Sequence, residues 1–461
     1  MNLMFAMVLS VGIKAISAVV ELAIQILLTN GIGVSAYGSY VFYIGLVEGT
    51  YFLLFSGSVK LNTFYLSTPC ASLRNFKKKY VRCYLAPVVG LILTVSLLLR
   101  NPYGVLAACI LGVYYFAFDT SGVFFSRGYQ LPGLLGEYLL GRLALLTGVL
   151  TVLRLNLAHT LVLFSLYGTQ FLIVLLWYSL HRKKLKPGSE EIQVPLRKLA
   201  EFQISDVASS LVSYSPTILQ YLFGGAFTAG FSGIISVVRS FTNFISGPTE
   251  KVFLPSFSQL YKAGERQKLE QSYLMIVQIQ MVFVGTIGAI LLIFPRLFLS
   301  IFSPDLVQYA DVFSGTAACL LLVSGMGPVT GMLQMTENEK ICNRNQWTSI
   351  AVMVLVWIVL RREPLFAIYG ICVQALVEGG LKYYSVCRWF GKSIIPVRKY
   401  ILLWLPVLLL RLLVERMGWT YSWLAGFCCV AFVFLWNLSA ALMNPLVKAE
   451  LLSKLVQIRK K

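Results

Sequence analysis

A nearly continuous series of apolar stretches is the feature of this sequence that most constrains its fold. The hydrocarbon core of a bilayer is about 30 Å thick, and a helix needs roughly 20 apolar residues to cross it. The apolar run from Leu91 to Leu99 does not alternate with polar residues as strands of a membrane barrel do. The sequence therefore predicts an all-α polytopic membrane protein with about 14 transmembrane helices. The predicted spans are 3–28, 37–56, 81–99, 104–126, 134–153, 157–180, 203–224, 229–257, 272–294, 311–335, 346–361, 364–388, 399–416 and 419–443.

Composition and charge agree with a membrane location. Hydrophobic residues make up 57% of the chain and charged residues only 13%, whereas about a quarter of a soluble domain is charged. The net charge of +20 does not indicate nucleic acid, because most basic residues fall in the loops of one membrane face. The opposite face receives a few arginines, such as Arg100 and Arg154. The positive-inside rule therefore predicts that both termini are cytoplasmic.

The polar segment between the sixth and seventh spans divides the chain. We predict a six-helix bundle over 1–180, a cytoplasmic linker over 181–200 and a second six-helix bundle over 201–390. Residues 391–461 are predicted to form a terminal helix pair with a basic tail, which is either an interfacial amphipathic helix or disordered. The first span is expected to be retained rather than cleaved, because Lys14 interrupts its apolar core.

Two segments rich in small residues indicate that the halves are repeats. One follows the first span, over 31–40, and the other follows the seventh, over 224–233. Setting Ser35 against Thr228 brings two alanines and two serines into register. Transporters built from repeats place their substrate path at the repeat interface. We therefore expect a central cavity between the two bundles.

Polar residues inside the spans form three stripes at helical spacing. A charge in the membrane is costly, so it usually faces a cavity or a partner. Lys14, Glu21 and Gln25 share one face of the first helix. The seventh span carries the second stripe: Asp206, Ser209, Ser210, Ser213, Thr217 and Gln220. The eighth span carries the third: Ser232, Ser236, Arg239, Asn243, Ser246 and Glu250.

These stripes provide candidate site residues. Lys14 and Arg239 are the candidates for binding an anionic group, because a guanidinium offers a planar fork of donors and an ammonium a point charge. Carboxylates in a partly dry cavity are suited to taking up a proton or a sodium ion. The candidates for coupling or for lining the cavity are Glu21, Gln25, Glu48, Asp119, Asp206, Ser213 and Asn243.

Structural interpretations stay open for several of these residues. Lys14 and Glu21 either line the cavity or pair within their own helix. Asp119 either acts in the cavity or caps and hydrates a helix end, and Asp206 either acts there or stabilises a helix dipole. Glu378 is expected to pair with Lys382 four residues later. The nine cysteines contain no CxxC pair and are interpreted as small apolar residues.

Three segments of the chain resemble the polysaccharide branch of the multidrug/oligosaccharidyl-lipid/polysaccharide exporter superfamily. They are Gly33-Val-Ser-Ala-Tyr-Gly38, Ala229-Gly-Phe-Ser-Gly-Ile-Ile-Ser236 and the proline-containing segment 247–258. Together with the length and span count, they are similar to bacterial O-antigen or capsule repeat-unit flippases. Many relatives carry an acidic-basic pair near residues 215–222, where this chain has none.

The resemblance implies a fold and a function. Two bundles would rock around a central cavity and carry undecaprenyl-pyrophosphate-linked oligosaccharide across the bacterial inner membrane. It also implies coupling to H⁺ or Na⁺ without ATP, with Lys14 and Arg239 meeting the pyrophosphate and sugars. A polysaccharide polymerase and a chain-length regulator are the candidate protein partners.

Two other functions compete with this one. A drug or organic-cation antiporter of the same superfamily would favour an acidic cavity, and the candidate charges here are mixed. A membrane-embedded glycosyl- or acyltransferase needs a carboxylate-metal or histidine constellation, yet the only histidines are His159 and His181. We therefore expect a protein that is not an enzyme and has no cofactor or metal site.

Overall fold

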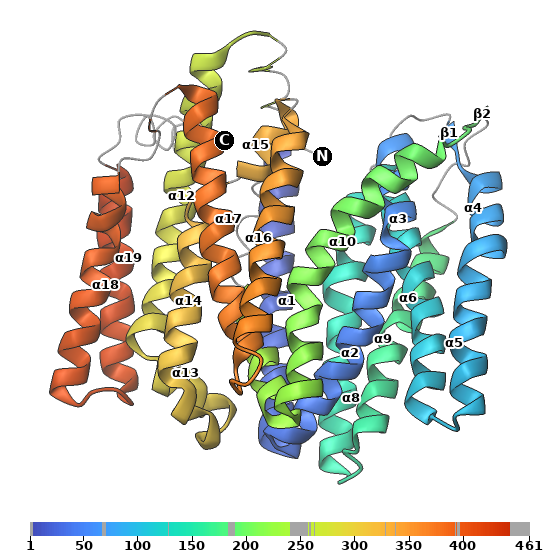
Figure 1. The fold of residues 1–461 in the computed structure, drawn as a ribbon, viewed down its shortest axis with the longest axis horizontal. Helices are drawn as coiled ribbons and strands as arrows, with labels where there is room; N and C mark the ends of the chain where they lie inside the picture. Colours follow the sequence, from blue (N-terminus) through green and yellow to red (C-terminus); the bar gives the residue numbers. More distant parts are fainter. Residues whose placement is uncertain are drawn as a thin grey trace. The chain divides into compact units, whose positions relative to one another are not determined.

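The computed structural model confirms the predicted all-α membrane class. It describes residues 3–66, 71–127, 129–182, 190–239, 257, 260–261, 263–327, 329–336, 338–391, 393 and 397–442. Each predicted span overlaps a helix of this part of the chain, and Figure 1 shows helices almost throughout. Within the same residues, eight helices are long and apolar enough to cross a membrane. The number 14 therefore stays a prediction.

The chain divides into two compact units. The first comprises Met1–Ile234 with Arg362–Ala367, and the second comprises Ile235–Arg361 with Ile368–Lys461. The helix Ala226–Arg239 crosses the boundary. The proposed division at the polar linker stays a prediction, and each unit is described by itself.

Thirteen helical segments in the described part of the first unit precede the helix Ala226–Arg239. They are α1 (Leu3–Ile32), α2 (Val34–Leu54), α3 (Ser56–Tyr65), α4 (Arg74–Tyr80), η1 (Val81–Leu85), α5 (Ala86–Leu98), α6 (Pro102–Ser126), α7 (Gln130–Leu134), η2 (Leu135–Leu140), α8 (Gly141–Arg154), α9 (Thr160–His181) and α10 (Leu196–Leu219), which continues as η4 (Gln220–Gly224). In η1, η2 and η4 the helix widens to π geometry.

Local sequence sets several helix ends. Asn101 accepts hydrogen bonds from the backbone N–H groups of Tyr103 (3.1 Å) and Gly104 (3.3 Å), and Pro102 occupies the first turn of α6. This is a capped helix start. Gly33 and Gly225 have φ angles of +81° and +90°, which favour glycine. Each of them lies directly before a helix.

The two glycine-rich repeat segments pack against each other where α2 meets the helix Ala226–Arg239. A Cβ on Gly38 would lie 1.7 Å from the carbonyl oxygen of Ala226, and a Cβ on Gly230 would lie 2.5 Å from that of Val34. The contact is reciprocal, as expected of related repeats. It relates Gly38 to Gly230 and Gly33 to Gly225, which is one residue away from the predicted match of Ser35 with Thr228. The repeat and its register stay predictions.

The end of the linker joins the first unit. Strand β2 (Glu190–Glu191) pairs in parallel with β1 (Ala71–Ser72). The Glu191 carboxylate accepts hydrogen bonds from the Ser72 hydroxyl and from the backbone N–H of Asn75, each 2.7 Å long. Residues 183–189 lie outside the described residues.

The second unit is also helical. Its elements are α12 (Arg266–Ile293), α13 (Pro295–Phe302), η5 (Pro304–Tyr309), α14 (Ala310–Ser324), α15 (Val329–Met335), α16 (Glu339–Val359), α17 (Phe366–Phe390), α18 (Val397–Met417) and α19 (Trp423–Leu442). Helix α12 packs against α14, α18 and α19. A hydrophobic core of the second unit includes Tyr273, Ile276 and Met332, all fully buried. Tyr273 donates a hydrogen bond of 2.7 Å to the Met326 carbonyl. The predicted basic tail beyond Leu442 lies outside the described residues.

Candidate functional site

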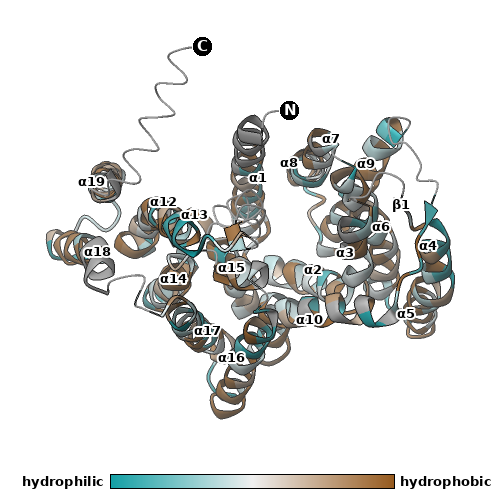
Figure 2. Ribbon diagram, turned by 90° about the horizontal axis from the view of Figure 1, so that it is seen from above, coloured by the Kyte–Doolittle hydropathy of each residue, from teal (hydrophilic) through white to brown (hydrophobic). Residues whose placement is uncertain are grey.

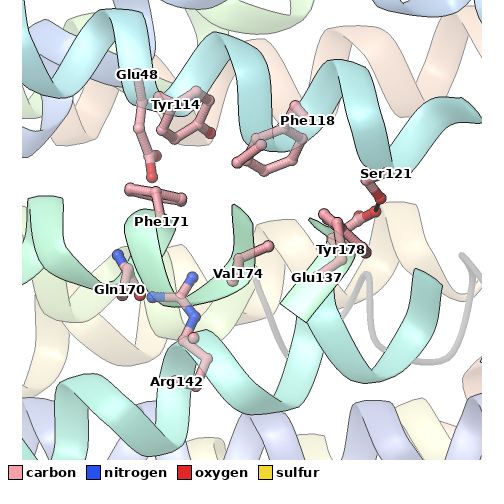
Figure 3. Close-up of a pocket in the computed structure, with 12 residues that line it drawn as sticks. Glu48, Tyr114, Phe118, Ser121, Glu137, Arg142, Gln170, Phe171, Val174 and Tyr178 are labelled. Atoms are coloured by element: carbon pink, nitrogen blue, oxygen red, sulfur yellow. Dashed lines mark hydrogen bonds between the residues drawn. The ribbon is translucent and has the colours of Figure 1, made fainter. Parts of the chain in front are cut away.

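A cavity of about 70 Å³ lies inside the first unit. Helices α2, α6, α8 and α9 and the π segment η2 contribute its lining. Figure 3 shows polar groups of both charge signs among aromatic rings. The lining residues are Glu48, Tyr114, Ala117, Phe118, Ser121, Glu137, Gly141, Arg142, Gln170, Phe171, Val174 and Tyr178.

Arg142 is the basic residue of this lining. Its Nη2 atom lies 3.6 Å from Glu21 Oε1, and the two side chains are 30% and 31% exposed. The negative charge of Glu48 also attracts the Arg142 guanidinium. Glu48 in turn accepts a hydrogen bond from the Tyr167 hydroxyl. The Arg142 guanidinium thus pairs with a carboxylate of α1 and lines the same cavity as a carboxylate of α2.

The far wall of the cavity holds a second carboxylate. Glu137 lies in η2 and accepts a 2.6 Å hydrogen bond from the Ser121 hydroxyl. Gln170 is 3% exposed, and among the described residues nothing accepts a hydrogen bond from its Nε2. A buried polar group without a partner is costly. The Gln170 amide therefore gives the cavity an available donor.

Aromatic rings form the apolar part of the lining. Tyr114 stacks on Phe118 with ring centroids 4.5 Å apart, and Phe171 meets Tyr114 edge-on at 4.6 Å. Such arrangements are favourable for aromatic pairs. The rings provide flat faces beside the charged groups.

The predicted stripe on α1 is only partly at this cavity. Lys14 is half-buried, with its Nζ 4.8 Å from the centre of the Tyr138 ring. Glu21 reaches Arg142 on α8. Gln25 carries a buried Oε1 atom for which no hydrogen-bond donor exists among the described residues. Lys14 and Gln25 do not line the cavity.

The predicted stripe on α10 lies largely in helix contacts. Ser210 donates to the Gly49 carbonyl of α2 over 3.4 Å, and the Thr217 and Ser232 hydroxyls are 3.1 Å apart. Gln220 donates to the Pro364 carbonyl over 3.0 Å. Asp206 is 6% exposed, whereas Ser213 is exposed.

Asp119 belongs to a separate polar network. Its carboxylate pairs with the Lys77 ammonium and accepts a 3.0 Å hydrogen bond from Asn62 Nδ2. Lys77 also donates to the Ser58 carbonyl over 3.2 Å. The network ties α3 and α4 to α6.

Arg239 lies in the second unit, so neither unit by itself brings Lys14 and Arg239 together. The charges of Arg239 and Glu378 interact. Glu378 forms the expected ion pair with Lys382 at 2.7 Å and accepts a 2.5 Å hydrogen bond from Gln374. Asn243 lies outside the described residues.

Sequence reasoning missed Arg142, Glu137 and Lys77. A signal was present for the first two, because both fall inside the predicted span 134–153, where charge is costly. Lys77 lies just before the predicted span 81–99, where a basic residue indicates only which membrane face the loop occupies. Among the described residues, no group of three His, Cys, Asp or Glu side chains could hold a metal ion.

The fold defines the class of protein: a multi-pass helical membrane protein with the fold of multidrug/oligosaccharidyl-lipid/polysaccharide exporter superfamily transporters. One similar solved structure is the lipid II flippase MurJ in an inward closed conformation, with TM-score 0.65, 12% identity, and coverage of 95% of this chain and 99% of that one. Another is an inward-facing multidrug resistance MATE family transporter of the MOP superfamily, with TM-score 0.60, 13% identity and coverage of 81% and 98%.

A eukaryotic MATE transporter is similar over 85% of this chain and 97% of its own, with TM-score 0.52 and 12% identity. No protein-family profile matches the sequence, and no curated protein does. The neighbours are transporters and flippases rather than enzymes.

Proposed function

We propose that this chain flips an undecaprenyl-pyrophosphate-linked oligosaccharide across the bacterial inner membrane by alternating access, for O-antigen or capsule synthesis. The likeness to a lipid II flippase over nearly the whole of both chains supports a substrate of this kind. H⁺ or Na⁺ is the proposed coupling ion. A polymerase and a chain-length regulator are the proposed partners.

The observation that carries the proposal is that Arg142 pairs with Glu21 and lines the same cavity as Glu48. A half-buried guanidinium that pairs with one carboxylate and interacts with the charge of a second can exchange partners when an ion or an anionic group arrives. Ion uptake by a carboxylate would release Arg142, and release would free its donor fork for phosphate or sugar oxygens. Arg142 therefore joins Lys14 and Arg239 as a proposed contact of the anionic head group.

The remaining candidates keep their proposed roles. Glu21 and Glu48 are proposed for coupling, with Gln25, Asp206, Ser213 and Asn243 lining the substrate path. Asp119 is proposed to act through Lys77, its ion-pair partner. Cytoplasmic termini stay part of the proposal.

The second candidate function is antiport of drugs or organic cations. Glu48 and Glu137 outnumber Arg142 among the charged lining residues, and an acidic cavity suits a cation. The likeness to MATE transporters supports the same alternative.

Complementation of a flippase-deficient bacterium tests the proposal. We expect the wild-type chain to restore surface polysaccharide and to remove lipid-linked intermediates from the inner leaflet. Lys14→Ala and Arg239→Ala should each abolish surface polysaccharide with the protein still in the membrane, whereas Arg239→Lys should keep part of the activity. Normal glycan display in both alanine variants would remove these two residues from the site.

A further inference from the structure

A second hollow lies on the first unit, away from the Arg142 cavity. It is open to the outside, has a volume of about 370 Å³ and lies between α4 and η1 on one side and α6 on the other. Its lining combines basic side chains with aromatic and aliphatic ones: Lys77, Lys78, Val81, Arg82, Tyr115, Phe116 and Asp119. It shares no lining residue with the Arg142 cavity.

Two cations of this hollow are exposed. Lys77 pairs with Asp119, so that one acid and one base cancel. Lys78 and Arg82 are exposed and carry the net positive charge of the lining. Asn62 holds the Asp119 carboxylate from the other side. The lining therefore combines a Lys77–Asp119 ion pair that is neutral overall with two exposed positive charges, Lys78 and Arg82.

The position along the helix places the hollow at the edge of the hydrocarbon core. Segments α4, η1 and α5 form one span over Arg74–Leu98, of which only 11% is buried in the protein. Lys78 precedes Leu98 by twenty residues, which at about 1.5 Å per residue is about 30 Å. That is the thickness of the hydrocarbon core. Figure 2 shows the same change, with α4 hydrophilic and the adjoining α5 largely hydrophobic.

We propose that the α4–η1–α6 hollow binds the headgroup of an anionic phospholipid of the surrounding membrane. Lys78 and Arg82 would contact the phosphate, because juxtamembrane basic side chains attract anionic lipid. Val81 and the exposed ring of Phe116 (44%) would contact the glycerol and the first methylenes. A lipid fits better than a soluble anion because most of the Arg74–Leu98 span faces outward, where acyl chains lie.

A binding measurement with detergent-purified, full-length protein tests this site. The probes are dioctanoyl phosphatidylglycerol, dioctanoyl phosphatidylcholine and inorganic phosphate, each competing against a fluorescent phosphatidylglycerol. We expect phosphatidylglycerol to compete at least tenfold better than the other two. The double variant Lys78→Gln/Arg82→Gln should weaken phosphatidylglycerol binding about thirtyfold, since each basic side chain near an anionic surface contributes about fivefold.

Matched variants distinguish a specific lipid site from non-specific attraction by the exposed basic residues. Lys79→Gln removes an exposed charge from the same helix outside the hollow and should change binding less than twofold. The variant Lys78→Arg/Arg82→Lys keeps both charges and should bind phosphatidylglycerol as the wild type does. Equal losses in Lys79→Gln and in the double variant, or no loss in the double variant, would overturn the proposal. Equal competition by inorganic phosphate would also overturn it, because the occupant would then be a free anion.

Discussion

Arg142 of α8 lies with its Nη2 atom 3.6 Å from Oε1 of Glu21 on α1. The two residues are 121 positions apart in the sequence, yet the fold brings them together beside a cavity that Arg142 and Glu48 line. Their partial exposure leaves the pair accessible to an arriving ion or substrate group.

The first prediction concerns this pair. Arg142→Ala should lower transport more than tenfold, and Arg142→Lys should restore part of it, because an ammonium keeps the charge but loses the planar fork. The measurement is surface glycan in the complemented strain, with membrane protein levels measured in parallel. Arg154→Gln is the matched control, since Arg154 is exposed at the end of the same helix. Activity of Arg142→Ala equal to that of Arg154→Gln would contradict the role of Arg142.

A second prediction concerns the hydrogen bond from Tyr167 to Glu48. Tyr167→Phe removes a donor to the half-buried Glu48 carboxylate and should destabilise the protein by about 2 kcal/mol, as for other hydrogen bonds to charged groups. Thermal unfolding of the purified protein measures this. Tyr84→Phe is the control, because Tyr84 is 39% exposed. Equal melting temperatures in the two variants would mean that the bond contributes nothing to stability.

A third prediction concerns the crossing of the repeat segments. Gly38→Ala places a Cβ against the Ala226 carbonyl, where only 1.7 Å is available, so α2 and the helix Ala226–Arg239 must separate. We expect at least a tenfold loss of glycan display. Gly112→Ala is the matched control, because no heavy atom lies within 4 Å of its added Cβ. Wild-type display in Gly38→Ala would show that the close approach is not needed.

A fourth prediction concerns the network around Asp119. Removing one partner of a largely buried ion pair leaves the other charge uncompensated, and Asp119→Ala should therefore destabilise the first unit by about 3 kcal/mol. The double variant Lys77→Gln/Asp119→Asn should lose less, because it leaves no unpaired charge. Melting temperatures in detergent compare the two. A larger loss in the double variant would contradict this ordering.

The fold could be predicted from the sequence because each membrane crossing needs its own long apolar run, and such runs are visible one at a time. The repeat stays a prediction, which rests on segments 31–40 and 224–233 both being rich in small residues. The sequence did not show that Gly38 and Gly230 approach the backbone of the other segment. The periodicity of a helix indicates which of its faces is packed, but not which residues of another helix that face meets.

The candidate site, too, was predicted only in part from the sequence. Glu21 and Glu48 could be predicted because charges within apolar spans are costly. Their partner could not, because the phase of α1 or α2 does not say which helix faces it. The pairing of Lys77 with Asp119 joins positions 42 residues apart and depends on how α4 packs beside α6.

The most direct test of the central claim uses the purified chain reconstituted into liposomes with a lipid-linked oligosaccharide on the inner leaflet. The account predicts that the oligosaccharide becomes accessible to an impermeant enzyme added outside when an H⁺ or Na⁺ gradient is applied. Arg142→Ala should abolish this movement, and Arg154→Gln should not. Exchange of a cationic dye against the gradient, with no movement of the lipid-linked oligosaccharide, would contradict the flippase account and support the antiporter.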